Sequence, residues 1–348
     1  MNTTHPIDQK KVSQTLDINK VWIPLLLGIG MIGYLLLTDP DLNMDQLPRI
    51  WEAKIGYVLL AVATVVIRDI MYISRIRILT KASLSWISCM FIIILWEFSS
   101  AVTPSAVGGT LIATFLFLKE GISFSKALAY VMVTAIFDNL FFICMAPLSF
   151  WFAADNLVTP ASSVHIGFWI SYTLITCYTI IMIVALFAQP KFFKWALVKI
   201  TSIKPLRRWK GWATQQGNEM MMASEALKGE SATYWMKLGV VTLLVWTARY
   251  GILNALIAAY VPVTWLDHVI IFGKHIIMWV TMLISPTPGS SGTAEFFFKK
   301  LYSNLLGQYT LITTILWRMI TYYLYLFAGI IALPRWLKKS ASMHDTTK

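Results

Sequence analysis

Long apolar runs, separated by short polar stretches, dominate the chain. Each run is close to the roughly 20 residues that an α-helix needs to cross about 30 Å of hydrocarbon. The runs lie near 21–37, 55–73, 84–102, 126–150, 166–188, 235–261, 266–284 and 310–333. They lack the strict alternation of barrel strands, and only helices or closed barrels satisfy their backbone in lipid. The pattern therefore predicts an all-α polytopic membrane protein.

The composition supports this class. Hydrophobic residues make up 57% of the 348 residues and charged residues 13%, whereas about 25% of the residues of soluble domains are charged. An ordinary soluble domain is therefore excluded.

The sequence contains no recognisable cofactor, metal or catalytic motif. The three cysteines lie far apart within apolar runs, and the five histidines have no ligand spacing. No phosphate-binding loop, dinucleotide-binding glycine motif or nucleophile elbow is present. We therefore expect no cofactor, no metal and no catalytic residue, and a transporter is favoured over an enzyme.

The distribution of basic residues predicts the sidedness of the chain. Lys and Arg are concentrated in 68–81, in 189–237 and in the C-terminal tail, whereas 151–165 and 261–267 have none. Because Lys and Arg mark cytoplasmic loops, both termini and both basic segments are predicted to be cytoplasmic, in a bacterial cytoplasmic (inner) membrane. The net charge of +12 is thereby assigned to membrane topology, and no nucleic-acid partner is expected.

Counting membrane crossings from these sides predicts two hairpins inside the membrane. The stretch 84–119 must begin and end on the cytoplasmic side, and 266–305 must begin and end on the opposite side. A short polar stretch lies in the middle of each, VTPSAVGG at 102–109 and SPTPGSSG at 285–292. Such breaks are typical of transporters whose broken helices meet near the midplane.

Matched spacings indicate an internal repeat. Residues of the same kind or role recur at separations of 180 to 182, namely Pro104 and Pro286, Gly108 and Gly289, Arg68 and Arg249, and Asp138 and Arg318. The predicted fold is an inverted-repeat bundle of about six full spans plus two re-entrant or broken helical hairpins. Its parts are a cytoplasmic tail at 1–20, a first membrane repeat at 21–150, a second membrane repeat at 166–333 and a cytoplasmic tail at 334–348.

The second repeat contains a basic, aromatic linker at 189–234. It includes KFFKWALVKI and KPLRRWKGW, in which Lys and Arg are interleaved with Trp and Phe. This composition suits an amphipathic helix lying among anionic lipid headgroups, which we expect to contact 189–212. A dedicated regulatory site is the alternative.

The helices that follow the two bends are predicted to begin inside the membrane. Their unsatisfied N–H groups and positive dipole ends would form natural anion sites. The alternative is that glycine and proline only permit tight packing or a kink. The candidate substrate-binding residues are Pro104, Gly108, Gly109 and Thr110 at the first bend, and Pro286, Pro288, Gly289, Gly292 and Glu295 at the second.

Four charged residues, Glu97, Asp138, Arg249 and Arg318, fall near the centres of apolar runs. Each costs roughly 2.5–3.5 kcal/mol at mid-helix, so these side chains should face a cavity or each other. Asp138 and Arg318, at equivalent places in the two halves, are predicted to pair and to line a polar path. The alternative is a structural ion pair that holds the halves together.

Two further charges have local interpretations. Glu295 stands in the first turn of its helix, where it can cap the helix or pair with Lys299 one turn later; near a headgroup it would instead bind a cation. Arg68 lies close to the predicted cytoplasmic boundary, so we interpret it as a topology determinant and not as a ligand contact.

Several motifs resemble one family. PSAVGG followed by LKEGISFSKALAYVMVTAIFDN, then SPTPGSSGTAE and WRMITYYLYLFAG, are similar to the transmembrane region of lysylphosphatidylglycerol synthases, which is also found as a stand-alone flippase-like protein. The resemblance covers roughly 20–335. Ser290 replaces the second glycine of the usual P-x-P-G-G-x-G-x-x-E motif, and Thr114 stands near a position where the family commonly has arginine.

The resemblance implies transport of a phospholipid, often aminoacylated, between leaflets; some relatives are linked to glycan-carrying polyprenyl lipids. Full-length relatives add a soluble aminoacyl-transferase domain, so this chain resembles the flippase part. The leading hypothesis is a lipid flippase or transporter for a membrane phospholipid or lipid-linked substrate. One alternative is a membrane enzyme that transfers an aminoacyl or sugar group to a lipid, with Asp138, Glu97 or Glu295 as base. Another is a non-catalytic scaffold, and homo-oligomerisation is left open.

Overall fold

The structure is a computed structural model that describes residues 44–103, 106–153, 163–283, 285 and 287–345, together with six isolated positions between 26 and 37. In some helical stretches, including 106–111 and 337–345, only the backbone is described. The predictions for the tail at 1–20 and for most of the run at 21–37 therefore lie outside the described residues.

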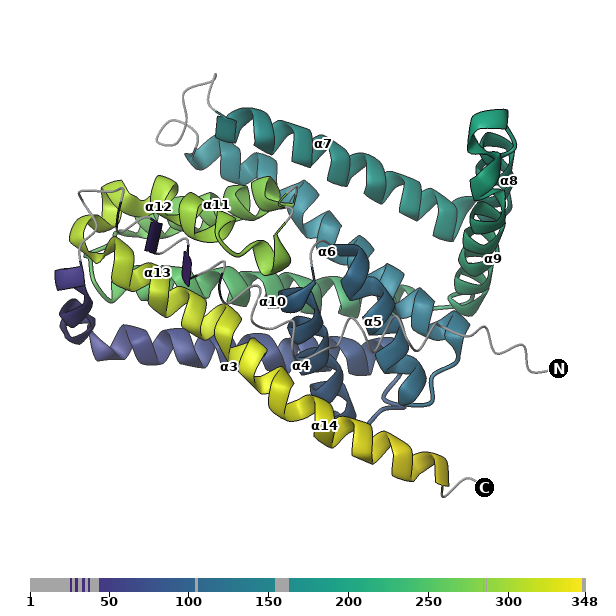
Figure 1. The fold of residues 1–348 in the computed structure, drawn as a ribbon, viewed down its shortest axis with the longest axis horizontal. Coiled ribbons are helices and arrows are strands. Elements are labelled where there is room, and N and C mark those ends of the chain that lie inside the picture. The colour runs from purple at the N-terminus through teal and green to yellow at the C-terminus, as the bar shows by residue number, and fades with distance from the viewer. Residues whose placement is uncertain are drawn as a thin grey trace.

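Every regular element within the described ranges is a helix (Figure 1). The α-helices are α3 (Ile55–Leu79), α4 (Trp86–Val102), α5 (Ala106–Lys119), α6 (Phe124–Ala153), α7 (Ser163–Ile183), α8 (Pro190–Thr201), α9 (Lys210–Ala226), α10 (Ala232–Ala258), α11 (Trp265–Met282), α12 (Thr293–Leu306), α13 (Thr310–Arg318) and α14 (Leu324–Asp345). Two π-helical segments, Val184–Ala188 and Met319–Tyr323, continue α7 and join α13 to α14.

Five stretches of the described chain are long and apolar enough to cross a membrane. They are Ile55–Leu79, Phe124–Trp151, Ile166–Ala188, Ala232–Ala258 and Pro288–Trp336. They coincide with five of the six predicted full spans, and the sixth is the run at 21–37. The all-helical, multi-span class is thus confirmed.

The helices before and after the linker follow a similar order of lengths. The lengths of α3, α4, α5 and α6 are 25, 17, 14 and 30 residues, and those of α10, α11 and α12 are 27, 18 and 14. In Figure 1, α4 and α5 lie in the half of the molecule where α3 ends, and α11 and α12 in the half where α3 begins. The order of helix lengths is thus similar before and after the linker, while the hairpins and the inverted repeat stay predictions.

Local signals explain where the helices begin. Ser85 and Ser231 accept hydrogen bonds from the backbone N–H groups of Ser88 and Tyr234 and so cap α4 and α10. Thr264 and Asp267 form a reciprocal capping box at the start of α11. Such caps satisfy N–H groups that the helix itself cannot pair.

Helix α3 extends beyond the predicted apolar run at 55–73. It continues without a break to Leu79 and packs along α10, so Arg68 and Arg75 lie inside a helix and not in a loop. Arg68 is fully buried and Arg75 is almost so. The guanidinium of Arg68 is thus enclosed by neighbouring helices, while its interpretation as a topology determinant stays a prediction.

The linker forms helices, as predicted. Helices α8 and α9 pack against each other, and Figure 1 shows them across the end of α7, nearly perpendicular to the long helices.

A glycine allows a close contact between two helices elsewhere in the bundle. A Cβ at Gly329 of α14 would lie 2.3 Å from the Phe98 ring of α4. Such small residues let membrane helices approach closely.

Candidate functional site

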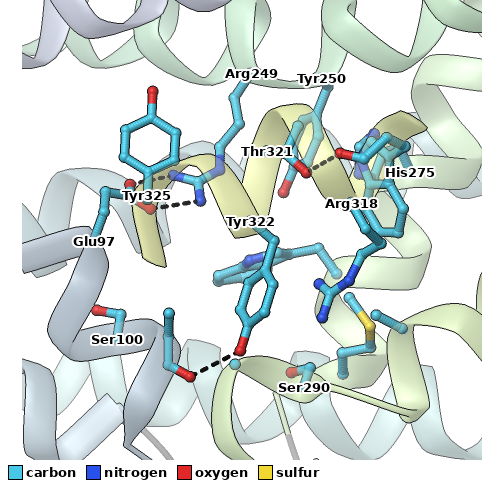
Figure 2. A pocket seen from close by; sticks show the side chains of 16 residues that line it. Glu97, Ser100, Arg249, Tyr250, His275, Ser290, Arg318, Thr321, Tyr322 and Tyr325 are labelled. Carbon is cyan, nitrogen blue, oxygen red and sulfur yellow. Dashed lines mark hydrogen bonds and ion pairs between the residues drawn. The ribbon is translucent and has the colours of Figure 1, made fainter. Parts of the chain in front are cut away.

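A cavity of about 240 Å³, lined by charged, hydroxyl and aromatic side chains, lies between the short helices α4, α11 and α12 and the long helices α10 and α14 (Figure 2). Its lining comes from α4, α10, α11, the second bend, α12, α13, the π-helical segment and α14. The side chains that give it a polar character include those of Glu97, Arg249, His275, Arg318, Tyr322 and Tyr325.

Glu97 of α4 and Arg249 of α10 form a bidentate ion pair at one side of the cavity (Figure 2). Nη1 lies 2.7 Å from Oε1 and Nη2 lies 3.1 Å from Oε2. Arg249 Nη1 also donates to the hydroxyl of Tyr72, at 2.8 Å. These two charges both line the cavity and face each other, in agreement with the cost of burying an unpaired charge in lipid.

Arg318 of α13 and Glu295 of α12 form a second, more deeply buried pair. Arg318 Nε lies 2.8 Å from Glu295 Oε1, and Arg318 Nη2 donates to Ser291 Oγ at 3.1 Å. The other carboxylate oxygen of Glu295 accepts from the N–H of Gly292, at 2.7 Å. Glu295 is therefore the cap of α12, as one of its interpretations predicted, and it also neutralises Arg318.

The predicted pairing of Asp138 with Arg318 is wrong. Asp138 of α6 binds Arg75 of α3, with Nη1 to Oδ1 at 2.5 Å, and accepts from the indole N–H of Trp246 at 2.7 Å. Asp138 is not among the described residues that line the cavity. Equal positions in two halves of a sequence need not meet in space, because each side chain pairs with the nearest opposite charge on the face that its helix presents.

The two bends are described to different extents. Pro104 and Pro286 lie outside the described residues, and at Gly108, Gly109 and Thr110 only the helical backbone of α5 is described. At the second bend, Pro288–Ser290 forms one 3-10 turn in which Gly289 has φ +54° and Ser290 has φ +53°. Gly292, with φ +85°, then precedes the first residue of α12.

The second bend adjoins the cavity. Gly289, Ser290 and Ala294 line it, so the start of α12 is next to the cavity, as the anion-site hypothesis requires. The N–H of Gly292, however, is already bound by the Glu295 carboxylate. The helix start therefore carries its own anion.

Tyr322, which sequence reasoning missed, links the end of α4 to the second bend. Its hydroxyl donates to the carbonyl oxygen of Ala101 at 2.9 Å and accepts from Ser291 Oγ at 3.2 Å. The Arg318 guanidinium lies over its ring, 3.9 Å from the centroid, and a Cβ at Gly289 would lie only 2.4 Å from Tyr322 Cε2. The one sequence signal was its place in WRMITYYLYLFAG; its π-helical backbone, a feature frequent at functional sites, is visible only in the structure.

His275 and Tyr250 also line the cavity and were not identified from sequence. Their ring centroids lie 4.4 Å apart. His275 Nδ1 and the Tyr250 hydroxyl are buried and have no hydrogen-bond partner among the described residues. Both lie within apolar runs with no distinctive spacing, so no pattern could have indicated them. They supply an imidazole nitrogen and a hydroxyl to the cavity wall, beside its charged groups.

Tyr325 connects the cavity to Arg68. The hydroxyl of Tyr325 donates to Asp69 Oδ2 at 2.5 Å and also contacts Arg68, whose guanidinium lies 4.6 Å from the Tyr325 ring centroid. Arg68 Nη2 in turn lies 2.8 Å from Asp69 Oδ1. Arg68 thus joins α3 to α14 beside the cavity.

Within the described part of the chain, no cluster of three or more His, Cys, Asp or Glu side chains could hold a metal ion. The described polar groups at the cavity are instead guanidinium, carboxylate, hydroxyl, imidazole and indole groups.

Comparison with known proteins gives the same family as the motifs. Residues 21–329 match the family described as lysylphosphatidylglycerol synthase TM region. A UPF0104 membrane protein of Archaeoglobus fulgidus is 24% identical over 256 residues, which cover 70% of this chain and 74% of that protein. No solved structure matches.

Proposed function

Because this chain is a multi-pass membrane protein that belongs to the lysylphosphatidylglycerol synthase TM family, we propose that it is a lipid flippase. The proposed substrate is a phospholipid, aminoacylated forms included, or a related anionic lipid. The protein moves this lipid between the two leaflets of the membrane.

The observation that carries the proposal is the polar cavity between the short helices. Its wall combines the end of α4 with the start of α12, and it contains Arg249 and Arg318, both able to bind a phosphate. Its volume of about 240 Å³ is smaller than the roughly 300–1,000 Å³ typical of sites for drug-sized ligands. A cavity of this size suits a headgroup, so the acyl chains remain in the bilayer while the headgroup crosses.

The two hairpins would serve as the moving parts. In inverted-repeat transporters one bundle rocks against another around a central site built from broken helices. In this chain α4 packs against the second bend, and Tyr322 bonds to Ala101 of α4 and to Ser291 of the bend. Rearrangement of these contacts would open the cavity to one side or the other.

The proposed orientation has both termini and the linker on the cytoplasmic side of a bacterial inner membrane. Helices α8 and α9 and the turn between them expose Phe192, Trp195, Ile200, Trp209 and Trp212, next to lysine and arginine side chains. Exposed aromatic groups beside basic ones suit the surface of an anionic leaflet. This surface would anchor the linker against headgroups.

A leaflet-resolved assay tests the proposed function. The purified protein is reconstituted into vesicles that contain an acyl-labelled phospholipid, and the fraction accessible to a membrane-impermeant quencher is followed with time. We expect faster transbilayer movement than in protein-free vesicles and a large loss of that movement with Arg249→Gln. The control is Arg335→Gln, an exposed arginine of α14. Equal rates for wild type and Arg249→Gln would overturn the proposal.

Lipid extracts of cells with and without the gene separate transport from chemistry. A changed leaflet distribution at constant lipid composition supports the flippase. Loss of a lipid species would instead support an enzyme that modifies lipids.

A further inference from the structure

The charges at the cavity are already neutralised within the protein. Arg249 is held by Glu97, and Arg318 is held by Glu295. The neighbouring Arg68 is held by Asp69. The three arginines and three carboxylates around the cavity balance one another, which differs from the electropositive site expected from the two helix starts.

A headgroup that carries only negative charge fits this arrangement poorly. To bind Arg249 it must displace Glu97, which would then stay in a low-dielectric site without a cation. Removing one partner of a buried ion pair is strongly unfavourable because the remaining charge is uncompensated. The N–H of Gly292 offers no alternative, because Glu295 occupies it.

Two of these three ion pairs contain an arginine that lines the cavity, Arg249 or Arg318, and these two pairs differ in how accessible they are. The side chains of Arg249 and Glu97 are 24% and 19% exposed, whereas those of Arg318 and Glu295 are 5% and 0% exposed. Glu295 also caps α12 and Arg318 is covered by the Tyr322 ring. The pair that can exchange partners is therefore Glu97 with Arg249.

We propose that the cavity selects a zwitterionic headgroup, one that carries a phosphate together with an ammonium group, and that Glu97 determines this selectivity. The phosphate takes the place of Glu97 on Arg249, and the released Glu97 carboxylate binds the ammonium. Each charge keeps a partner throughout the exchange, and Tyr72 continues to hold Arg249 through its hydroxyl. This inference rests on the proposed transport of a phospholipid through the cavity.

The test compares two acyl-labelled lipids that differ in headgroup charge. Phosphatidylethanolamine carries a phosphate and a primary amine, and phosphatidylglycerol carries the phosphate alone. After the rates in protein-free vesicles are subtracted, we expect the wild-type protein to move phosphatidylethanolamine about tenfold faster than phosphatidylglycerol. The reason is that only phosphatidylethanolamine can compensate both members of the exchanged pair. Faster or equal movement of phosphatidylglycerol would overturn the inference while leaving the proposed function in place, and movement of neither lipid would overturn both.

Glu97→Gln supplies the second part of the test. The variant leaves Arg249 without its carboxylate, so it should prefer phosphatidylglycerol over phosphatidylethanolamine, the reverse of the wild-type order. The matched control is Glu225→Gln, which removes an exposed carboxylate that is paired with Lys228 and does not line the cavity, and it should keep the wild-type ratio. An unchanged preference in Glu97→Gln would overturn the role of Glu97. Should the variant not fold, the wild-type comparison of the two lipids still decides whether the cavity selects a zwitterionic headgroup.

Discussion

The hydroxyl of Tyr322 donates a hydrogen bond to the carbonyl oxygen of Ala101, at 2.9 Å, across 221 residues of sequence. Ala101 lies in the last turn of α4, where carbonyl groups have no partner within the helix. Tyr322 therefore caps the end of α4 from the other half of the chain. Because it also binds Ser291, one side chain holds the end of α4 and the second bend together.

Tyr322→Phe should weaken this connection without disturbing the aromatic packing. The change leaves the Ala101 carbonyl and the Ser291 hydroxyl without the Tyr322 partner in a buried place, so we expect a loss of about 1–3 kcal/mol in the free energy of unfolding. Thermal unfolding in detergent micelles measures it. Tyr178→Phe, at an exposed tyrosine of α7, is the control; an equal change in both variants would contradict the role given to the hydroxyl.

Gly289→Ala should be severely destabilising. The backbone of Gly289 has φ +54°, and a Cβ there would lie 2.4 Å from Cε2 of Tyr322. The substitution must either displace the Tyr322 ring or distort the second bend, so we expect both thermal stability and lipid transport to fall. Gly56→Ala in α3 is the matched control, because a Cβ at Gly56 meets nothing within 4 Å and alanine favours a helix by about 0.5–1 kcal/mol. Similar stability of the two variants would show that the close contact with Tyr322 does not limit this position.

Ser290→Gly should stabilise the protein. Ser290 has φ +53°, a conformation that costs a residue with a side chain roughly 1–2 kcal/mol. Glycine relieves this strain but increases the entropy of the unfolded chain, so we expect a net gain of about 0.5–1 kcal/mol in the free energy of unfolding. In contrast, Ser224→Gly within α9 should lose stability, because glycine is unfavourable in a helix. Denaturation that shows a loss in both variants would contradict the strain at Ser290.

Double-mutant cycles should separate the observed partner of Asp138 from the one predicted by sequence. Asp138→Asn and Arg75→Gln remove the two sides of one ion pair, so their effects on stability should differ from additivity by about 0.5–3 kcal/mol. Asp138→Asn combined with Arg318→Gln should be additive within about 0.5 kcal/mol. A larger coupling in the second cycle than in the first would support the sequence-based pairing instead.

The sequence indicated the second bend and Glu295 but not how they are used. The prolines and glycines of SPTPGSSG interrupt an apolar run, which locates a bend because these residues disfavour helix interiors. Glu295 at the third position of the following helix indicated a cap, and the structure has that cap. Its bond to Arg318 depends on how α12 and α13 pack, and spacing along the chain does not record this.

The charged residues show the same limit. Sequence located Glu97, Asp138 and Arg249 as charges buried in apolar runs, since a charge in lipid is costly wherever its helix lies. It assigned Arg68 to a boundary because hydropathy alone did not show that α3 continues to Leu79. The hydroxyls of Tyr322 and Tyr325 carry no net charge and could not be distinguished from the ordinary aromatic residues of a membrane helix.

The amino-acid sequence by itself determined that this is a helical membrane protein of several spans, where an apolar run is interrupted at the second bend, and that Glu97, Asp138, Arg249 and Arg318 lie within apolar runs. These are local properties, because a helix in lipid pairs its own backbone and must present apolar side chains to its surroundings. Only the tertiary structure decided which charge meets which, since Glu97 and Arg249 are 152 residues apart and Arg75 and Asp138 are 63 apart. Such pairs depend on the rotation and crossing of packed helices, and those are set by the fit of side chains between helices and not by the order of residues along any one of them.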